Sequence, residues 1–292
     1  MKTRSNAKTN DPTSSGRTGV LGEKWTALRR EAGLAAEHLA IGVTALGKAN
    51  YAQTAHYGQA FFALSTGFER AAKLILTVEY AVRNGGRFPP TSEIERHRHN
   101  LVRLLREVDL VGEGIGTHER LPNTAIHNGI IEVLSEFATN ITRYYNIELL
   151  TDSPRIKGRK DPIQRWHDDV IVPVLAQHYE PHHRERDEQQ ARAMDAVFGP
   201  ITMVRHTSED KRSLTSLYDS SMQGAKTEFA NPYVRLYVLQ IARFVAKVAG
   251  ELGRMAQSRR IEDVPVLSEF FATFCCSDRQ LKSRKRWSIY RP

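Results

Sequence analysis

Cysteine is scarce in this sequence, and long apolar runs are absent. The 292-residue chain has only two cysteines, Cys275 and Cys276, and they are adjacent. Neighbouring cysteines rarely pair, because the small ring that their disulfide would close is strained. Their apolar neighbours in EFFATFCC predict two buried thiols. This cysteine usage argues against a disulfide-stapled secreted domain, and we expect a cytoplasmic protein.

No stretch of about 18 apolar residues occurs, so we expect neither a membrane-spanning helix nor a membrane partner. The first residues, MKTRSNAKTNDPTSSGRTG, lack the apolar segment of a signal peptide. Their polar composition predicts a disordered arm over residues 1–22. Sustained strand alternation and repeats of solenoid period are lacking too, which argues against sheet and solenoid folds.

Motifs that would fix a chemistry are missing. The sequence contains no GxGxxG, no phosphate-binding loop, no GxSxG and no paired CxxC. His178, His182 and His183 form a cluster, but Pro181 interrupts the helix that would align them, and we expect a solvated surface cluster. His167-Asp168-Asp169 contains the His-Asp dipeptide of metal phosphohydrolases without a further set of ligands. We therefore expect no metal and no cofactor.

The net charge of +9 is concentrated at the two ends of the chain. Residues 1–30 carry a net +5 and residues 277–292 another +5, which leaves residues 31–276 at −1. Basic ends can bind phosphate backbones, and they can equally serve to keep a protein soluble. Composition leaves these two alternatives open.

Apolar residues recur at helical spacing over most of the chain. The strongest pattern lies within 51–84, where one stripe holds Phe61, Leu64, Phe68, Ala71, Ile75, Val78 and Val82. Glu69–Lys73 and Glu79–Arg83 are spaced as ion pairs on its polar side. Further helices are predicted over 23–48, 92–110, 123–150, 182–198, 208–222, 231–257 and 265–276. The sequence therefore predicts an all-α fold.

Caps and breakers place the boundaries of these helices. Ser92 with Glu95 is spaced as a capping box, and Asp161 before Pro162 is a helix start signal. Pro173 is expected to kink or break the helix that follows, and Asn231-Pro232 is expected to open the long helix near the C-terminus.

The best domain boundary is 151–161, which combines proline, glycine and several cations without apolar periodicity. We expect a helical bundle over 23–150, a basic linker over 151–161, a second helical bundle or array over 162–276, and a basic tail over 277–292. The alternative is one large helical array that is split near residue 155.

Cations of the linker and the tail are the candidate nucleic-acid-binding residues: Arg155, Lys157, Arg159, Lys160, Arg284, Lys285, Arg286 and Trp287. Trp287 belongs to this set because a ring among cations suits single-stranded nucleic acid. Its ring could instead dock on the bundle, and the sequence leaves this alternative open.

Three segments of the first half resemble HEPN domains, which are compact helical bundles of many prokaryotic toxins and defence proteins. They are YGQAFFALSTGFERAAKLIL at 57–76, FPPTSEIERHRHNLVRLL at 88–105 and RYYNIELL at 143–150. The resemblance covers roughly residues 23–150. It implies an up-and-down bundle, often paired in a homodimer.

Catalytic members of that family are metal-independent ribonucleases with an arginine and a histidine near the start of the last bundle helix. Only Arg120 and His127, in RLPNTAIHNG, fit this implied spacing. The histidine would act as general acid or base, and the arginine would stabilise the phosphorane charge. Two hypotheses follow: a helical binding or scaffold module of a defence or toxin system that binds RNA or another protein, or an endoribonuclease that uses Arg120 and His127.

Overall fold

The computed structural model describes residues 22–139 and 142–288, and in this part of the chain the fold is all-α, as predicted. The first part contains α1 (Glu23–Leu46), α2 (Ala55–Arg83), α3 (Thr91–Glu95), α4 (Leu101–Gly114), α5 (Ala125–Ala138) and α6 (Tyr145–Leu150). The middle contains η1 (Pro154–Ile156), α7 (Pro162–Trp166), the π turn η2 (His167–Ile171), α8 (Val172–His178), α9 (Pro181–Phe198) and η3 (Gly199–Ile201). The last part contains β1 (His206–Thr207), β2 (Ser213–Leu214), α10 (Leu217–Ser258), α11 (Leu267–Phe271), η4 (Ala272–Phe274) and α12 (Asp278–Ser283). The arm predicted over 1–22 lies outside the described residues, except for Gly22.

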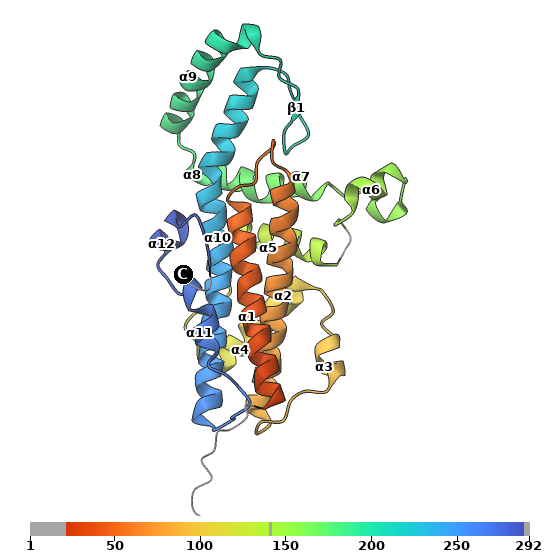
Figure 1. Ribbon diagram of the computed structural model, residues 1–292, viewed down its shortest axis with the longest axis vertical. Helices are drawn as coiled ribbons and strands as arrows, with labels where there is room; N and C mark the ends of the chain where they lie inside the picture. The colour runs from red at the N-terminus through yellow and green to blue at the C-terminus, as the bar shows by residue number, and fades with distance from the viewer. Residues whose placement is uncertain (1–21, 140–141, 289–292) are drawn as a thin grey trace, which may run out of the picture.

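Helices α1, α2 and α10 run side by side along the long axis of the molecule (Figure 1). The seven apolar residues predicted to form one stripe of α2 are all buried. Glycines let α1 and α2 approach closely: a Cβ on Gly42 would lie 2.6 Å from Leu64 Cγ, and one on Gly67 would lie 2.9 Å from the Leu39 nitrogen. The predicted surface pairs also form, with 2.7 Å between Lys73 and Glu69.

Helix α10 corrects two predictions. It begins at Leu217, where the Ser216 side chain accepts a hydrogen bond from the Asp219 nitrogen. The helix is 42 residues long and passes through Pro232 without a break. The predicted start at Asn231-Pro232 is wrong, because buried residues on both sides of Pro232 keep the helix intact despite the missing N–H. Since α10 also contacts α1, α2, α4 and α5, both sides of 151–161 share one core, which corrects the expected division into two bundles.

Three other helix boundaries differ from the predictions. The helix expected over 92–110 is broken after α3, where Arg98 has a positive φ of 46°, and the Asn100 side chain caps the start of α4. The helix expected over 123–150 ends at Ala138, and α6 is a separate short helix. Pro173 does not break its helix, because the π turn η2 lies directly before it. The predicted cap at Asp161 is confirmed, with 2.8 Å from its carboxylate to the Ile163 nitrogen.

The helix predicted over 208–222 is wrong in its first part, since the hairpin of β1 and β2 extends to Leu214, whereas residues 217–222 belong to α10. Glu209 at the turn of the hairpin is buried, and its carboxylate accepts hydrogen bonds from Tyr57 at 3.2 Å and Gln223 at 2.7 Å. These side chains lie on α2 and α10. The hydrogen bonds of Glu209 to side chains of α2 and α10 therefore hold this segment as a hairpin and not as a helix.

Two parts of the chain project from the bundle (Figure 1). The hairpin of α9 and α10 extends beyond the top, and α6 extends to the right. The C-terminal elements α11, η4 and α12 lie along α10. In the ranges that the structure describes, no helix is both long and apolar enough to cross a membrane.

Candidate nucleic-acid interface

Arg120 lies on the loop before α5 and is held by carboxylates. Its Nε and Nη2 donate to Asp109 at 3.0 and 2.8 Å, and Nη2 also donates to Glu113 at 3.3 Å. These hydrogen bonds raise the pKa of Arg120 and lower the pKa of Asp109. The guanidinium is thus already neutralised by side chains of α4, which leaves little of its charge for a phosphate.

His127 is 3 % exposed and is part of the core. Its Nδ1 lies 2.7 Å from Thr124 Oγ1, and its Nε2 lies 2.9 Å from Gln240 Oε1. Burial lowers the pKa of His127. Within the described residues no hydrogen bond or ion pair joins His127 to Arg120. The structure therefore does not assemble the predicted catalytic pair.

The histidines of the second half do not gather as metal ligands. His178 stacks on Tyr233 with 4.0 Å between ring centroids, and its Nε2 lies 2.9 Å from the Tyr237 hydroxyl. His182 and His183 contact each other, with 4.0 Å between their ring centroids. Residues 22–139 and 142–288 contain no group of His, Cys, Asp or Glu side chains that could hold a metal ion.

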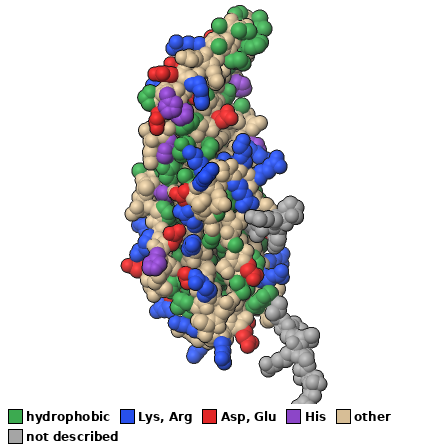
Figure 2. Space-filling model, turned by 90° about the vertical axis from the view of Figure 1, so that its left-hand side faces the viewer, with side chains coloured by type: hydrophobic (Ala, Val, Ile, Leu, Met, Phe, Trp, Pro, Cys, Tyr) green, Lys and Arg blue, Asp and Glu red, His purple; other side chains and the backbone are tan. Residues whose placement is uncertain are grey.

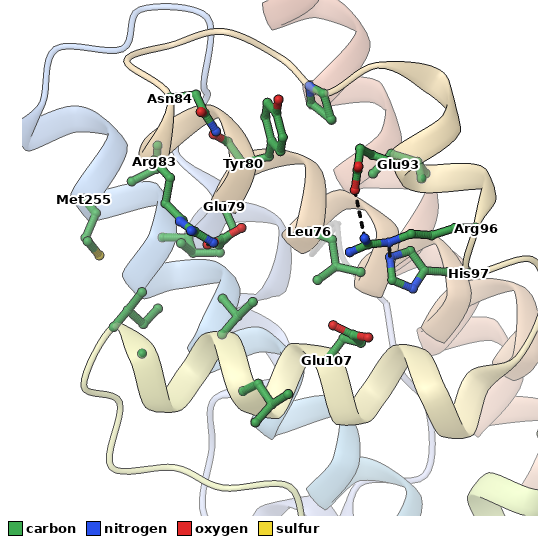
Figure 3. Close-up of a pocket in the computed structure, with 18 of the residues that line it drawn as sticks. Leu76, Glu79, Tyr80, Arg83, Asn84, Glu93, Arg96, His97, Glu107 and Met255 are labelled. Carbon is green, nitrogen blue, oxygen red and sulfur yellow. Dashed lines mark hydrogen bonds and ion pairs between the residues drawn. The ribbon is translucent and has the colours of Figure 1, made fainter.

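A pocket of about 740 Å³ lies between α2, α3, α4 and α10 (Figure 3). Three glutamates and three arginines line it, so its charges balance. Arg96 donates from Nε to His97 Nε2 at 3.2 Å, so the neutral ring carries its proton on Nδ1, which has no partner in the described part of the chain. Burial, and then the nearby Arg96, lower the pKa of His97. A pocket with balanced charges does not favour a phosphate.

Most of the linker cations have carboxylate partners. Arg155 lies 3.2 Å from Glu148, Arg159 lies 3.5 Å from Glu136, and Lys160 lies 2.6 Å from Asp168. Lys157 is exposed, and none of the described carboxylates pairs with it. The linker therefore presents less free positive charge than its composition suggests.

The predicted basic tail is part of the folded body up to residue 288. Ser277 and Gln280 form a capping box at the start of α12. Trp287 is 5 % exposed and stacks on Phe274 with 5.9 Å between ring centroids. Its backbone nitrogen donates to Thr44 Oγ1 at 3.0 Å. Trp287 is thus docked, and its ring is not available to stack on a base.

The packing of Trp287 against α1 and η4 holds residues 284–286 near the end of α1. We call the cations at this place the C-terminal basic surface: Lys48, Arg284, Lys285 and Arg286. None of the four has a carboxylate partner among residues 22–139 and 142–288. Lys48, Lys285 and Arg286 are exposed. Arg284 lies over the Trp287 ring at 4.5 Å. Figure 2 shows Lys and Arg side chains gathered on this side of the molecule, at the height of α12.

Beneath this surface lies a buried arginine. Arg235 on α10 is 5 % exposed, and its Nη1 donates to the Lys285 carbonyl at 3.3 Å. It touches the end of α1, since a Cβ on Gly47 would lie 3.0 Å from Arg235 Cδ. The partial negative charge of a helix C-terminus stabilises such a cation. Burial lowers the pKa of Arg235.

A cleft of about 670 Å³ borders the surface on the side of α11. Hydrogen-bonding side chains line it, namely those of Thr273, Gln280, Ser283, Arg284 and Ser288, together with Glu269. Arg284 Nη1 donates to Thr273 Oγ1 at 3.2 Å, which orients the guanidinium along the cleft wall. Glu269 balances the charge of Arg284 in this cleft, so the cleft adds hydroxyl donors beside the surface but no net positive charge.

Sequence reasoning found Arg284, Lys285 and Arg286 but missed Lys48, which lies more than 230 positions away, and no local pattern marks it. It also expected two buried thiols, whereas Cys275 is exposed because η4 ends just before it at Phe274. Comparison with protein-family models, curated proteins and solved structures gives no match for the chain. The resemblance to HEPN domains therefore stays a prediction.

Proposed function

We propose that the chain is a non-catalytic helical module that binds the phosphate backbone of RNA at the C-terminal basic surface. One observation carries the proposal: Lys48, Lys285 and Arg286 are exposed on the folded body without carboxylate partners in the described residues. The linker cations offer a contrast, because acidic side chains neutralise three of the four. Unpaired cations held in place attract a polyanion more strongly than paired ones.

The same geometry favours binding that does not read sequence. Phosphate contacts position a nucleic acid, while contacts to bases give specificity. Trp287 is the only ring of the candidate set, and it is buried against Phe274. The adjoining cleft adds hydroxyl donors, but Glu269 also lines it, so the exposed cations carry the attraction. We therefore expect affinity that depends strongly on salt and weakly on base composition.

The ribonuclease alternative has less support. A general acid–base histidine must reach the proton that it transfers, and His127 is enclosed by Thr124, Gln240 and Tyr237. Arg120 is engaged by Asp109. We accordingly propose binding without cleavage.

The test measures fluorescence anisotropy of a labelled single-stranded RNA at several salt concentrations. The variant Lys285→Ala/Arg286→Ala removes two cations of the surface. With a slope of about −0.7 in log K against log salt for each phosphate contact, it should flatten the slope by about 1.4 and weaken binding roughly 25-fold at 0.1 M salt.

The matched control is Arg155→Ala/Lys160→Ala, which lowers the net charge equally but removes cations that are paired with Glu148 and Asp168. It should weaken binding less than threefold. An equal loss of RNA affinity in the two variants would show that binding depends only on the overall charge of the protein. Absence of salt-dependent binding by the unaltered protein would refute the proposed function.

A further inference from the structure

Helix α3 stands apart from the rest of the bundle. None of its five residues is buried, and Figure 1 shows it to the right of α2, held by the loops at its two ends. The pocket of about 740 Å³ lies between α3 and the bundle (Figure 3). Small-molecule sites have volumes of about 300–1,000 Å³, so this pocket is large enough for a small organic ligand.

Apolar side chains line the pocket on each of its walls. They are Leu76 and Val82 on α2, Ile94 on α3, Leu110 and Val111 on α4, and Leu252 and Met255 on α10. Leu110 is 62 % exposed, so apolar surface at this place is open to water. Removing apolar surface from water is favourable, and a ligand with an apolar body would gain free energy by covering these side chains.

The charged side chains that line the pocket are already engaged. Their contacts are Arg83 with Glu79 at 3.2 Å, Arg96 with Glu93 at 3.0 Å, Glu107 with Arg103 at 3.7 Å, and Arg259 with the Val82 carbonyl at 2.7 Å. An ionic ligand would lose its water without meeting a counter-charge that lacks a partner, which is unfavourable. The pocket therefore favours an uncharged ligand.

One buried polar atom of the lining has no partner. His97 is 2 % exposed, and its Nε2 accepts a hydrogen bond from Arg96, so Nδ1 carries the proton of the neutral ring. No acceptor among residues 22–139 and 142–288 receives this N–H. Figure 3 shows the ring beside Arg96 and near Glu107 at one end of the pocket. A buried donor without a partner is unfavourable, and an acceptor on a ligand would remove that cost.

An acceptor reaches Nδ1 of His97 when α3 and the turn after it shift, because this atom is closed off from solvent in the chain alone. The turn contains Arg98 with a positive φ of 46°, and α3 has no buried residue, so few contacts hold the two in place. Segments with few buried contacts open at a low cost in free energy.

We propose that the pocket under α3 binds an uncharged small molecule that has an apolar body and one oxygen acceptor, a carbonyl or an ether, for the Nδ1–H of His97. The apolar walls bury the body, the engaged charges exclude ions, and the unpartnered donor selects the acceptor. This site is independent of RNA binding, since none of its lining residues belongs to the C-terminal basic surface.

Four probes with the same diphenylmethyl body test the class of ligand: diphenylmethane, benzophenone, diphenylacetate and diphenylmethylammonium. Titrations followed by the methyl NMR signals of Ile94, Ile115 and Met255 give the Kd of each. Benzophenone should shift these signals saturably and should bind at least about tenfold more tightly than either ion. Tighter binding of an ion, or no saturable binding of benzophenone, would overturn the proposal.

The variant His97→Phe tests the donor. It keeps a ring in the pocket but removes the N–H, so the Kd of benzophenone should rise at least about fivefold while that of diphenylmethane changes less than about twofold. Diphenylmethane has no acceptor and reports the shape of the pocket alone. Equal losses of affinity for the two probes would show that His97 only supports the fold, and the assigned hydrogen bond would be wrong.

The variant Ile94→Trp tests the location, because the larger ring fills the pocket from α3. It should weaken benzophenone binding at least about tenfold. The matched control Leu149→Trp places the same ring at a side chain that is 54 % exposed elsewhere, and it should leave the Kd unchanged. Circular dichroism should show the helical fold in both variants, since neither side chain is buried. Unchanged affinity in Ile94→Trp would place the bound probe outside the pocket and refute the site.

Discussion

The variant Trp287→Ala removes a buried ring that holds residues 284–288 against the bundle. In the folded protein the indole stacks on Phe274, and its Nε1 donates to the Arg284 carbonyl at 3.1 Å. Truncation of a buried tryptophan to alanine costs about 3–5 kcal/mol. Since this segment follows α12 and belongs to none of the helices of the bundle, it can detach while α1, α2 and α10 stay folded. The cost therefore falls on the docking equilibrium of the segment more than on global unfolding.

A change of about 3 kcal/mol raises the detached fraction more than a hundredfold. Limited proteolysis with trypsin detects it, because Lys282, Arg284, Lys285 and Arg286 are cleavage sites within or next to the segment. Cleavage follows the population of the open form when opening and closing are fast. We expect the cleavage rate there to rise at least tenfold in Trp287→Ala, as measured by mass spectrometry.

The conservative variant Trp287→Phe keeps ring packing on Phe274 but loses the Nε1 hydrogen bond. Its cleavage rate should therefore lie between those of the unaltered protein and Trp287→Ala. Cleavage after Lys157, on an exposed loop far from this segment in sequence, serves as an internal control and should not change. RNA affinity should fall in Trp287→Ala, because binding must then also order the cations. Equal cleavage rates in Trp287→Ala and the unaltered protein would refute the docking argument.

Two further predictions concern stability. Gly67→Ala should lower the free energy of unfolding by about 1–3 kcal/mol, because its Cβ would lie 2.9 Å from the Leu39 nitrogen. Gly58→Ala should raise the free energy of unfolding by up to about 1 kcal/mol, because no atom lies within 4 Å of the added Cβ. Urea unfolding measures both values, and a similar effect of the two changes would contradict the close packing of α1 and α2. Burial lowers the pKa of His97 and His127 below the usual 6.5, so the unfolded chain binds protons near that pH that the folded chain does not. Stability should therefore be full above about pH 6.5 and should decline below it, and a urea midpoint at pH 5.5 equal to or above that at pH 7.5 would show that these rings are not held neutral.

Local sequence was enough for the features that depend on residues a few positions apart. The spacing of Phe61, Leu64 and Phe68 predicted the buried stripe of α2, and Asp161 before Pro162 predicted a cap that the structure confirms. Both signals arise within one or two helical turns. Local rules failed at Pro232, where packing along the whole of α10 outweighs a strong helix breaker.

The sequence by itself determined the all-α class and the presence of cations near residues 155 and 285. Only the tertiary structure decided which of these cations are free, because Glu148 and Asp168 neutralise two in the linker while the C-terminal segment docks beside Lys48. It also enclosed His127 between Thr124 and Gln240. Helical periodicity is set by near neighbours along the chain. The burial of His127 depends on Gln240, which lies 113 positions away, and no local pattern encodes it. The linker ion pairs join residues only seven and eight positions apart, but across irregular turns for which no helical spacing predicts a contact.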